Sequence, residues 1–174
     1  NNNSIYKRMV EYTQSQIFNN SSLYFFSVQH QLIYNTSFKI IKDNYIFGIG
    51  PKNFRVICKD YQSFDKLDVT EDGCSTHPHN TYIQLLVETG IIGFLFIFII
   101  FLLIIYYLFY KIYLTNILKN YNHFLGRDLI LLSLFISLWP IIPTGSFFNN
   151  WLNIIYYLPL GFIIYYYFEY KNEH

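Results

Sequence analysis

The chain has 174 residues with a formal net charge of +1, and 53% of its residues are hydrophobic and 22% aromatic. This length suits one domain, but the apolar and aromatic content is not that of an ordinary soluble domain. The low net charge argues against a nucleic-acid partner, because no basic surface dominates. The charges are also uneven: residues 1–88 hold eight basic and eight acidic residues, and the remainder holds only seven charged residues. The sequence therefore predicts a polar N-terminal half joined to an apolar C-terminal half.

The N-terminal half begins with a predicted surface segment, since residues 1–22 are rich in Asn, Ser and Gln. In residues 23–41, apolar side chains recur at roughly helical spacing. His30 interrupts this run, which favours an amphipathic helix over a membrane span. The stretch Gly48-Ile-Gly50-Pro51 that follows is typical of a turn.

The chain has two cysteines, Cys58 and Cys74, which flank a polar, charged loop. A pair of this kind on the outer side of a membrane favours a disulfide, whereas two unrelated thiols are the alternative in a reducing compartment. Because the topology below places both cysteines outside, we expect the disulfide. Closing a loop of this length contributes about 3 kcal/mol in the chain-entropy model.

The C-terminal half is predicted to cross a membrane three times. Residues 89–110 carry no charge, and about twenty residues suffice to cross the hydrocarbon core. Residues 129–168 are again uncharged but too long for one span, so they divide at a polar, proline-containing stretch. The predicted elements are a span at 89–110, a loop at 111–128, a span at 129–147, a short hairpin at 148–150, a span at 151–168 and a tail at 169–174.

The charges of the loops predict the orientation. Loop 111–128 carries three basic residues and one acid, whereas 143–150 carries no charge, so the first loop is expected in the cytoplasm together with the tail. Residues 1–88 then lie outside, where Asn149 and Asn150 could contribute to the same external site. The expected fold class is all-α and integral to the membrane, with three C-terminal transmembrane helices preceded by a mostly helical external, periplasmic loop region. A chain that starts without Met or a signal peptide also suggests the C-terminal part of a longer membrane protein.

Polar chemistry is concentrated where the two halves join. Pro78 suits the first turn of a helix, which would place the cap at Thr76 or His77 and leave an anion-binding N-terminus facing outward. The same field would lower the pKa of His79, keeping it neutral and able to act as a base. A His-x-His pair could bind a metal, but no third ligand has a recognisable spacing, so we predict neither a metal nor a cofactor.

A polar stripe follows on the same helix. On a regular helix His77 belongs to this stripe and His79 points away from it. If the helix begins only near Asn80, His77 and His79 can both face one pocket. Glu88 would be costly in lipid unless it faces protein or water, so direct chemistry and a structural hydrogen bond are both open for it. The stripe consists of residues at i, i+4, i+7 and i+11, namely His77, Thr81, Gln84 and Glu88.

Two stretches together resemble the O-antigen ligase and O-antigen polymerase family. The first is Gly48-Ile-Gly50-Pro-Lys-Asn-Phe54-Arg55. The second is His79-Asn80 ahead of a helix that opens with Glu88-Thr-Gly90-Ile-Ile-Gly93. The resemblance covers roughly residues 27–95 by motif and the rest by topology.

This resemblance implies a multi-pass glycosyltransferase of the bacterial inner membrane, with residues 1–88 on the periplasmic side. Such an enzyme takes a glycan from undecaprenyl diphosphate and passes it to lipid A-core or to another lipid-linked repeat unit. Family members have more spans than three, so the chain would be a fragment that is inactive alone. The alternative is a non-enzymatic membrane component of polysaccharide export or assembly.

The resemblance also assigns roles to individual residues. The base or acceptor-orienting histidine maps onto His79, with His77 as the alternative, and the diphosphate-binding position maps onto Arg55. His30 stands where many members carry an arginine. The predicted substrate-binding residues are Arg55, His30, Lys52, Asn80 and Glu88.

Overall fold

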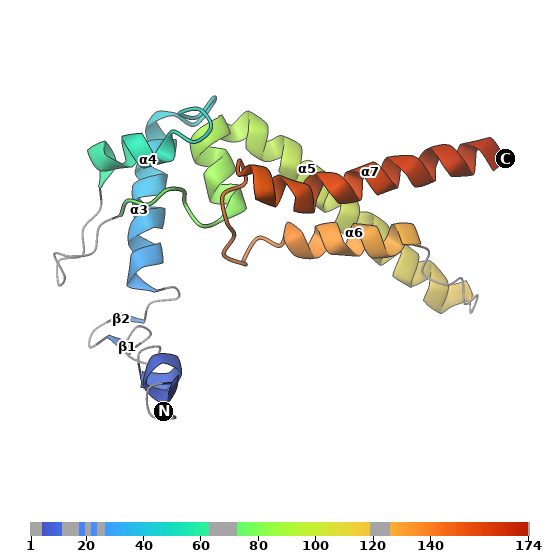
Figure 1. Cartoon of the computed structure of the whole chain (residues 1–174), viewed down its shortest axis with the longest axis horizontal. Helices are drawn as coiled ribbons and strands as arrows, with labels where there is room; N and C mark the ends of the chain where they lie inside the picture. The colour runs from blue at the N-terminus through green and yellow to red at the C-terminus, as the bar shows by residue number, and fades with distance from the viewer. Residues whose placement is uncertain are drawn as a thin grey trace.

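The chain is mostly helical (Figure 1). A computed structural model describes residues 5–11, 18–19, 22–23, 27–62, 73–118 and 126–173. The only strands in these ranges are two short ones that pair antiparallel. In chain order the elements are η1 (Lys7–Glu11), β1 (Phe18–Asn19), β2 (Ser22–Leu23), α3 (Val28–Asp43), α4 (Phe54–Ile57), η2 (Cys58–Tyr61), α5 (Thr81–Leu118), α6 (Gly126–Ser137) and α7 (Asn150–Glu173).

The helices form two apolar cores that share the first turns of α5. One core joins α3, α4 and α5 through residues such as Ile33, Phe54 and Val87. The other joins α5 to α6 and α7 through Leu85 and Leu134, among others. In Figure 1, α3 stands at an angle to the long α5, while α6 lies along α5 and packs against α7. Residues 81–90 therefore connect the region that precedes α5 to the apolar half.

In the described part of the chain, one helix is long and apolar enough to cross a membrane. It is the Thr81–Tyr113 part of α5, which contains the span predicted at 89–110 and an 18-residue stretch with a mean hydropathy of 3.0. The amphipathic helix expected at 23–41 corresponds to α3; residues 24–26 lie outside the described ranges. Three transmembrane helices are thus predicted, and one has the length and composition required.

The helix predicted at 129–147 is shorter than expected. α6 ends at Ser137, so its 12 residues reach about 18 Å, less than the roughly 30 Å of a hydrocarbon core. Pro140 and Pro143 lack the backbone N–H that a continuing helix needs. Residues 138–149, the α6–α7 connection, are instead irregular, and α7 begins only at Asn150.

The far end of α5 is joined to the start of α6 by a buried charged contact. Lys111 Nζ lies 3.3 Å from Asp128 Oδ2, and the Tyr107 hydroxyl donates to Asp128 Oδ1 at 2.8 Å. Asp128 is fully buried in the first turn of α6, where the helix dipole also favours an acid.

α5 is interrupted near its start at Gly90, whose backbone (φ +66°, ψ −167°) is not helical. The interruption turns main-chain groups of α5 outward, and the turn after α3 docks against them. Their hydrogen bonds are Ile49 N–H to the Val87 carbonyl at 2.9 Å, Gly50 N–H to the Glu88 carbonyl at 2.9 Å and Ile91 N–H to the Tyr45 carbonyl at 2.8 Å.

This docking brings backbone against backbone, which requires glycine on both sides. A Cβ on Gly48 would lie 2.5 Å from the Glu88 carbonyl carbon, and one on Gly90 would clash with the Ile46 carbonyl oxygen. Both glycines have φ between +66° and +67°, which L side chains rarely adopt. The Gly-x-Gly turn is therefore fixed by close approach as well as by its own geometry.

We expect Gly90→Ala to lower the free energy of unfolding by about 3 kcal/mol, because the new Cβ adds a steric clash to backbone strain. The measurement is thermal or denaturant unfolding of the complete natural protein in detergent. Gly161→Ala in α7 is the matched control, since a Cβ there meets nothing within 4 Å, and it should be neutral or slightly stabilising. Equal unfolding curves for the two variants would contradict the close approach at Gly90.

Candidate functional site

Three histidines meet just ahead of α5. The ring centroids of His77 and His79 are 4.2 Å apart, and those of His30 and His79 are 5.5 Å apart. His30 comes from the first turn of α3, where its Nδ1 lies 2.7 Å from the hydroxyl of the capping residue Ser27. The fold thus brings the upstream His30 to the His-x-His pair.

His79 has a left-handed backbone with φ +57°, a conformation that non-glycine residues rarely adopt. Its carbonyl accepts the N–H of Thr144 at 2.9 Å, and its Nε2 lies 2.9 Å from the Ser75 hydroxyl. No described residue bonds to its Nδ1. Burial, followed by the neighbouring charges of His77 and His30, lowers the pKa of His79 below its ordinary value of 6.5.

His77 is more enclosed, with 9% of its surface exposed. Its Nε2 lies 3.3 Å from the Thr144 carbonyl and its Nδ1 lies 2.9 Å from the Thr76 hydroxyl. A carbonyl can only accept, so Nε2–H is the donor, and Nδ1 accepts from the Thr76 hydroxyl in the neutral ring. Burial is the main cause that lowers the pKa of His77, and the Thr144 carbonyl partly opposes it. Both ring nitrogens of His77 therefore have partners within the chain.

Asn80 is the N-cap of α5. Its Oδ1 accepts the N–H groups of Tyr82 at 3.0 Å and Ile83 at 3.1 Å. Its Nδ2 donates to the carbonyl of Pro140 at 2.7 Å. The side chain of Asn80 thus fixes both the start of α5 and the position of the α6–α7 connection.

The cap predicted at Thr76 or His77 is therefore wrong. The preference of proline for a first helical turn suggested it, but Pro78 lies in the loop and the stronger capping residue, Asn80, starts the helix. Because the helix begins after both histidines, His77 and His79 are free to lie together.

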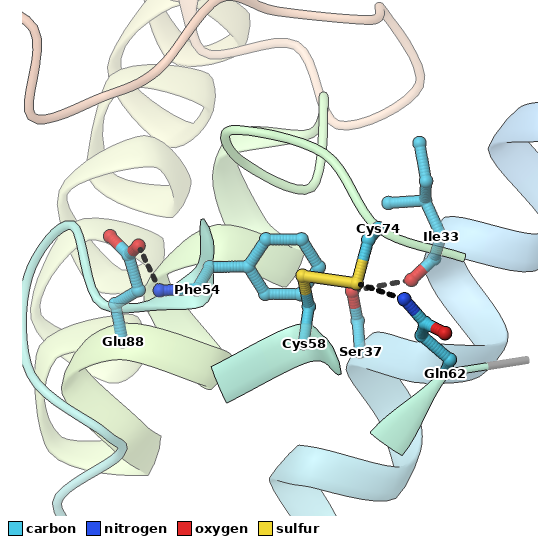
Figure 2. Close-up of a disulfide and its surroundings, with 7 residues drawn as sticks. All are labelled: Ile33, Ser37, Phe54, Cys58, Gln62, Cys74 and Glu88. Atoms are coloured by element: carbon cyan, nitrogen blue, oxygen red, sulfur yellow. Dashed lines mark hydrogen bonds between the residues drawn. A yellow bond between two sulfur atoms is a disulfide. The ribbon is translucent and has the colours of Figure 1, made fainter. Parts of the chain in front are cut away.

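Glu88 is fully buried and accepts from two donors of the chain itself, of which Figure 2 shows the N–H of Phe54. Its Oε1 accepts the N–H of Phe54 at 3.3 Å, and its Oε2 accepts the amide of Gln84 at 3.0 Å. The same amide nitrogen donates to the Ser146 hydroxyl at 3.0 Å, and the side-chain oxygen Oε1 of Gln84 accepts the N–H of Phe147 at 2.8 Å. Glu88 and Gln84 therefore fix α4 and the α6–α7 connection relative to α5.

Cys58 and Cys74 form a disulfide beside this network (Figure 2). Their Cα atoms are 5.5 Å apart, and Cys58 is almost fully buried. The Gln62 amide lies 3.6 Å from the sulfur of Cys74. The bond connects the helical turns that carry Arg55 to the loop that carries His77.

A cavity of about 490 Å³ lies where these segments meet. Lys52, which lines the cavity, has a left-handed backbone with φ +63°. Its backbone is therefore strained, as is that of His79. His79 is not among the lining residues but contacts the ring of His77, which is. The residues that the cavity brings together from three segments are Lys52 and Arg55, His77, and Asn149, Asn150 and Trp151.

The predicted site residues thus fall into two groups. Arg55, Lys52 and His77 line the cavity, and His30 adjoins it through His79. Asn80 and Glu88 are occupied by contacts that position the cavity's walls. Trp151 was not among the predicted site residues, because nothing in the sequence distinguishes its environment from that of Trp139.

One comparison with known proteins finds a match to part of the chain. Residues 27–98 match a family model described as O-antigen ligase, a class of membrane-associated enzymes of the ligase and polymerase type. The matched interval contains α3, α4, η2, the three histidines and the start of α5, and it confirms the resemblance over that part of the chain. Over residues 27–98 the chain is therefore similar to the O-antigen ligase family. No curated protein and no solved structure matches the chain.

We expect removal of the disulfide by the double change Cys58→Ser and Cys74→Ser to lower the free energy of unfolding by about 3 kcal/mol. The measurement is the melting temperature of the complete natural protein with and without reductant. Reductant should lower the wild-type value to that of the double variant and leave the variant unchanged. A reductant effect of equal size on both proteins would show that it acts elsewhere.

We expect His77→Gln to raise the pKa of His79, because it removes a neighbouring positive charge. Histidine titration by carbon-13 NMR would measure the change. In the wild type, both folded pKa values lie below 6.5, so the unfolded chain binds protons more tightly. Stability should therefore decrease as the pH falls below 6.5, and this loss should be smaller in the variant. An unchanged His79 pKa would contradict the ring contact.

Proposed function

We propose that the chain supplies part of the active site of a membrane glycosyltransferase that assembles surface polysaccharide. The proposed donor is a glycan on undecaprenyl diphosphate, and the acceptor is lipid A-core or another lipid-linked repeat unit. The observation that carries the proposal is the cavity in which Lys52 and Arg55 meet His77. The family match over residues 27–98 supports the same class of enzyme.

The two cations suit a diphosphate leaving group. Negative charge develops on the diphosphate as its bond to the sugar breaks, and fixed positive groups stabilise that charge. Arg55 can bind two phosphate oxygens at once, and Lys52 adds a compact charge beside it. Both side chains are exposed in the cavity region, so a ligand can reach them.

The histidine cluster supplies the base. In the proposed reaction the acceptor hydroxyl gives its proton to His79, its oxygen bonds to the anomeric carbon, and the diphosphate leaves with the electrons of the broken bond. His79 is suited to this role because its Nδ1 has no partner in the described residues and its lowered pKa keeps it neutral. His77, whose ring nitrogens are both engaged, acts as a positioning residue.

The proposed site lies at one end of α5. The cavity and the histidines precede or adjoin its first turns, whereas the pair of Lys111 and Asp128 lies at the other end. This arrangement fits a site on the periplasmic face of the inner membrane, with the 111–128 loop in the cytoplasm.

We expect Arg55→Gln and His79→Ala each to lower kcat of glycan transfer by about a hundredfold, since each removes one group that acts in the transition state. Arg55→Lys should be intermediate, because lysine keeps the charge but not the two-point contact. The assay uses the complete natural protein in membranes with the lipid-linked donor.

Lys59→Gln is the matched control, because Lys59 is an exposed cation on η2 that does not line the cavity. Equal rates for Arg55→Gln and Lys59→Gln would remove Arg55 from the reaction. Full activity of His79→Ala, with loss in His77→Gln, would transfer the role of base to His77.

A further inference from the structure

The cavity has a second wall to which the proposed chemistry gives no role. This wall comes from the α6–α7 connection and the first turn of α7, and it carries Asn149, Asn150 and Trp151. These residues lie outside the interval that matches the O-antigen ligase family. The cationic residues and the histidines account for a diphosphate and a proton transfer, but not for recognition of the sugar between them.

Local hydrogen bonds fix the position of this wall. The N–H of Asn149 donates to the Ser146 carbonyl at 3.0 Å, and the side-chain oxygen of Asn149 accepts the N–H of Trp151 at 3.1 Å. Asn149 thereby caps α7 and sets Trp151 in its first turn. No described residue bonds to the side-chain nitrogen of Asn149 or to the side-chain amide of Asn150. Polar groups at the cavity are thus available to a ligand.

Trp151 is the most exposed large apolar side chain in the described residues, at 82%. It has no ring partner among those residues, although it lines the cavity. The second tryptophan is different: Trp139 is 38% exposed and packs edge-on against Phe135 and Phe101, with centroids 5.1 Å and 6.4 Å away. A role as an aromatic anchor at the membrane interface would explain Trp139. It would not explain why Trp151 lies at a polar cavity.

We propose that Trp151, Asn149 and Asn150 form a subsite for the sugar ring that is bonded to the donor's diphosphate. The C–H face of a sugar ring packs on the negative face of an indole, and side-chain amides bond to sugar hydroxyls as donors and acceptors. A neutral aromatic and amide wall next to Lys52 and Arg55 matches a ligand in which a neutral ring is bonded directly to an anion. This assignment rests on the proposed function for the nature of the anion.

The dimensions and the rigidity of the cavity fit this ligand. A volume of about 490 Å³ lies in the range of small-molecule sites. The second wall is held against α5 by Gln84 through Ser146 and Phe147, and against the histidine loop by the bond from Thr144 to His79. Because these contacts form within the chain, binding a sugar requires little ordering of the wall.

The test measures binding of two probes to the complete natural protein in nanodiscs. One probe is the soluble glycan released by mild acid from lipid-linked intermediates, and the other is inorganic pyrophosphate. We expect Trp151→Leu to weaken glycan binding about tenfold, while Trp151→Phe keeps most of it, since the ring face supplies the contact. Trp139→Leu should leave glycan binding unchanged, and all three variants should bind pyrophosphate like the wild type.

Equal glycan binding by Trp151→Leu and the wild type would overturn the subsite. Equal losses of glycan binding in Trp151→Leu and Trp139→Leu would also overturn it, because both residues would then act as membrane anchors. A wild type that does not bind the released glycan would overturn it too. The transfer assay separates this inference from the proposed function. Glycan binding that depends on Trp151, without any glycan transfer, would support the subsite and refute the transferase. Glycan transfer by Trp151→Leu with an unchanged KM for the donor would support the transferase and refute the subsite.

Discussion

Where Gly90 interrupts α5, main-chain carbonyls turn from the helix toward the N–H groups of Ile49 and Gly50. This backbone contact places the Gly-x-Gly turn, and the turn sets where α4 begins. The carboxylate of Glu88, which immediately precedes the break, then accepts the N–H of Phe54 in the first turn of α4. The exposed cations of the cavity flank that point, so their position depends on an interruption in a membrane-type helix. A continuous α5 would have no free carbonyls to receive the turn.

The same short stretch of α5 also fixes the opposite wall. Asn80 and Gln84, about two turns and one turn before Glu88, bond to the α6–α7 connection, whereas Glu88 bonds to α4. Residues 81–90 are therefore buried by protein, whereas much of the later surface of α5 is apolar and exposed. This division explains why polar residues cluster at the start of the helix. They are structural connectors as well as candidate site residues, which is why substitution at Asn80 or Glu88 would disturb geometry before chemistry.

The sequence predicted the helical content, the long apolar α5 and the polar junction, because each depends on local composition or period. It did not predict where α6 ends or where α5 begins. In both places two local preferences compete: the uncharged run favours a span that continues through Pro140, and Pro78 suits a first helical turn. The meeting of His30 with His79 and the place of Trp151 at the cavity depend on contacts between segments far apart in the chain. The family resemblance marked His30 and His79 as site residues, but it carried no information on Trp151.

The pair formed by Lys111 and Asp128 gives the apolar half a charge-compensated contact at the far end of α5. A lone charge near the hydrocarbon is costly, and the cost falls when the opposite charge lies 3.3 Å away. The two residues belong to consecutive helices, so neither is compensated until both have been synthesised. The pairing therefore makes each helix a condition for burying the charge of the other: without α6 in place, the end of α5 would carry an unpaired cation.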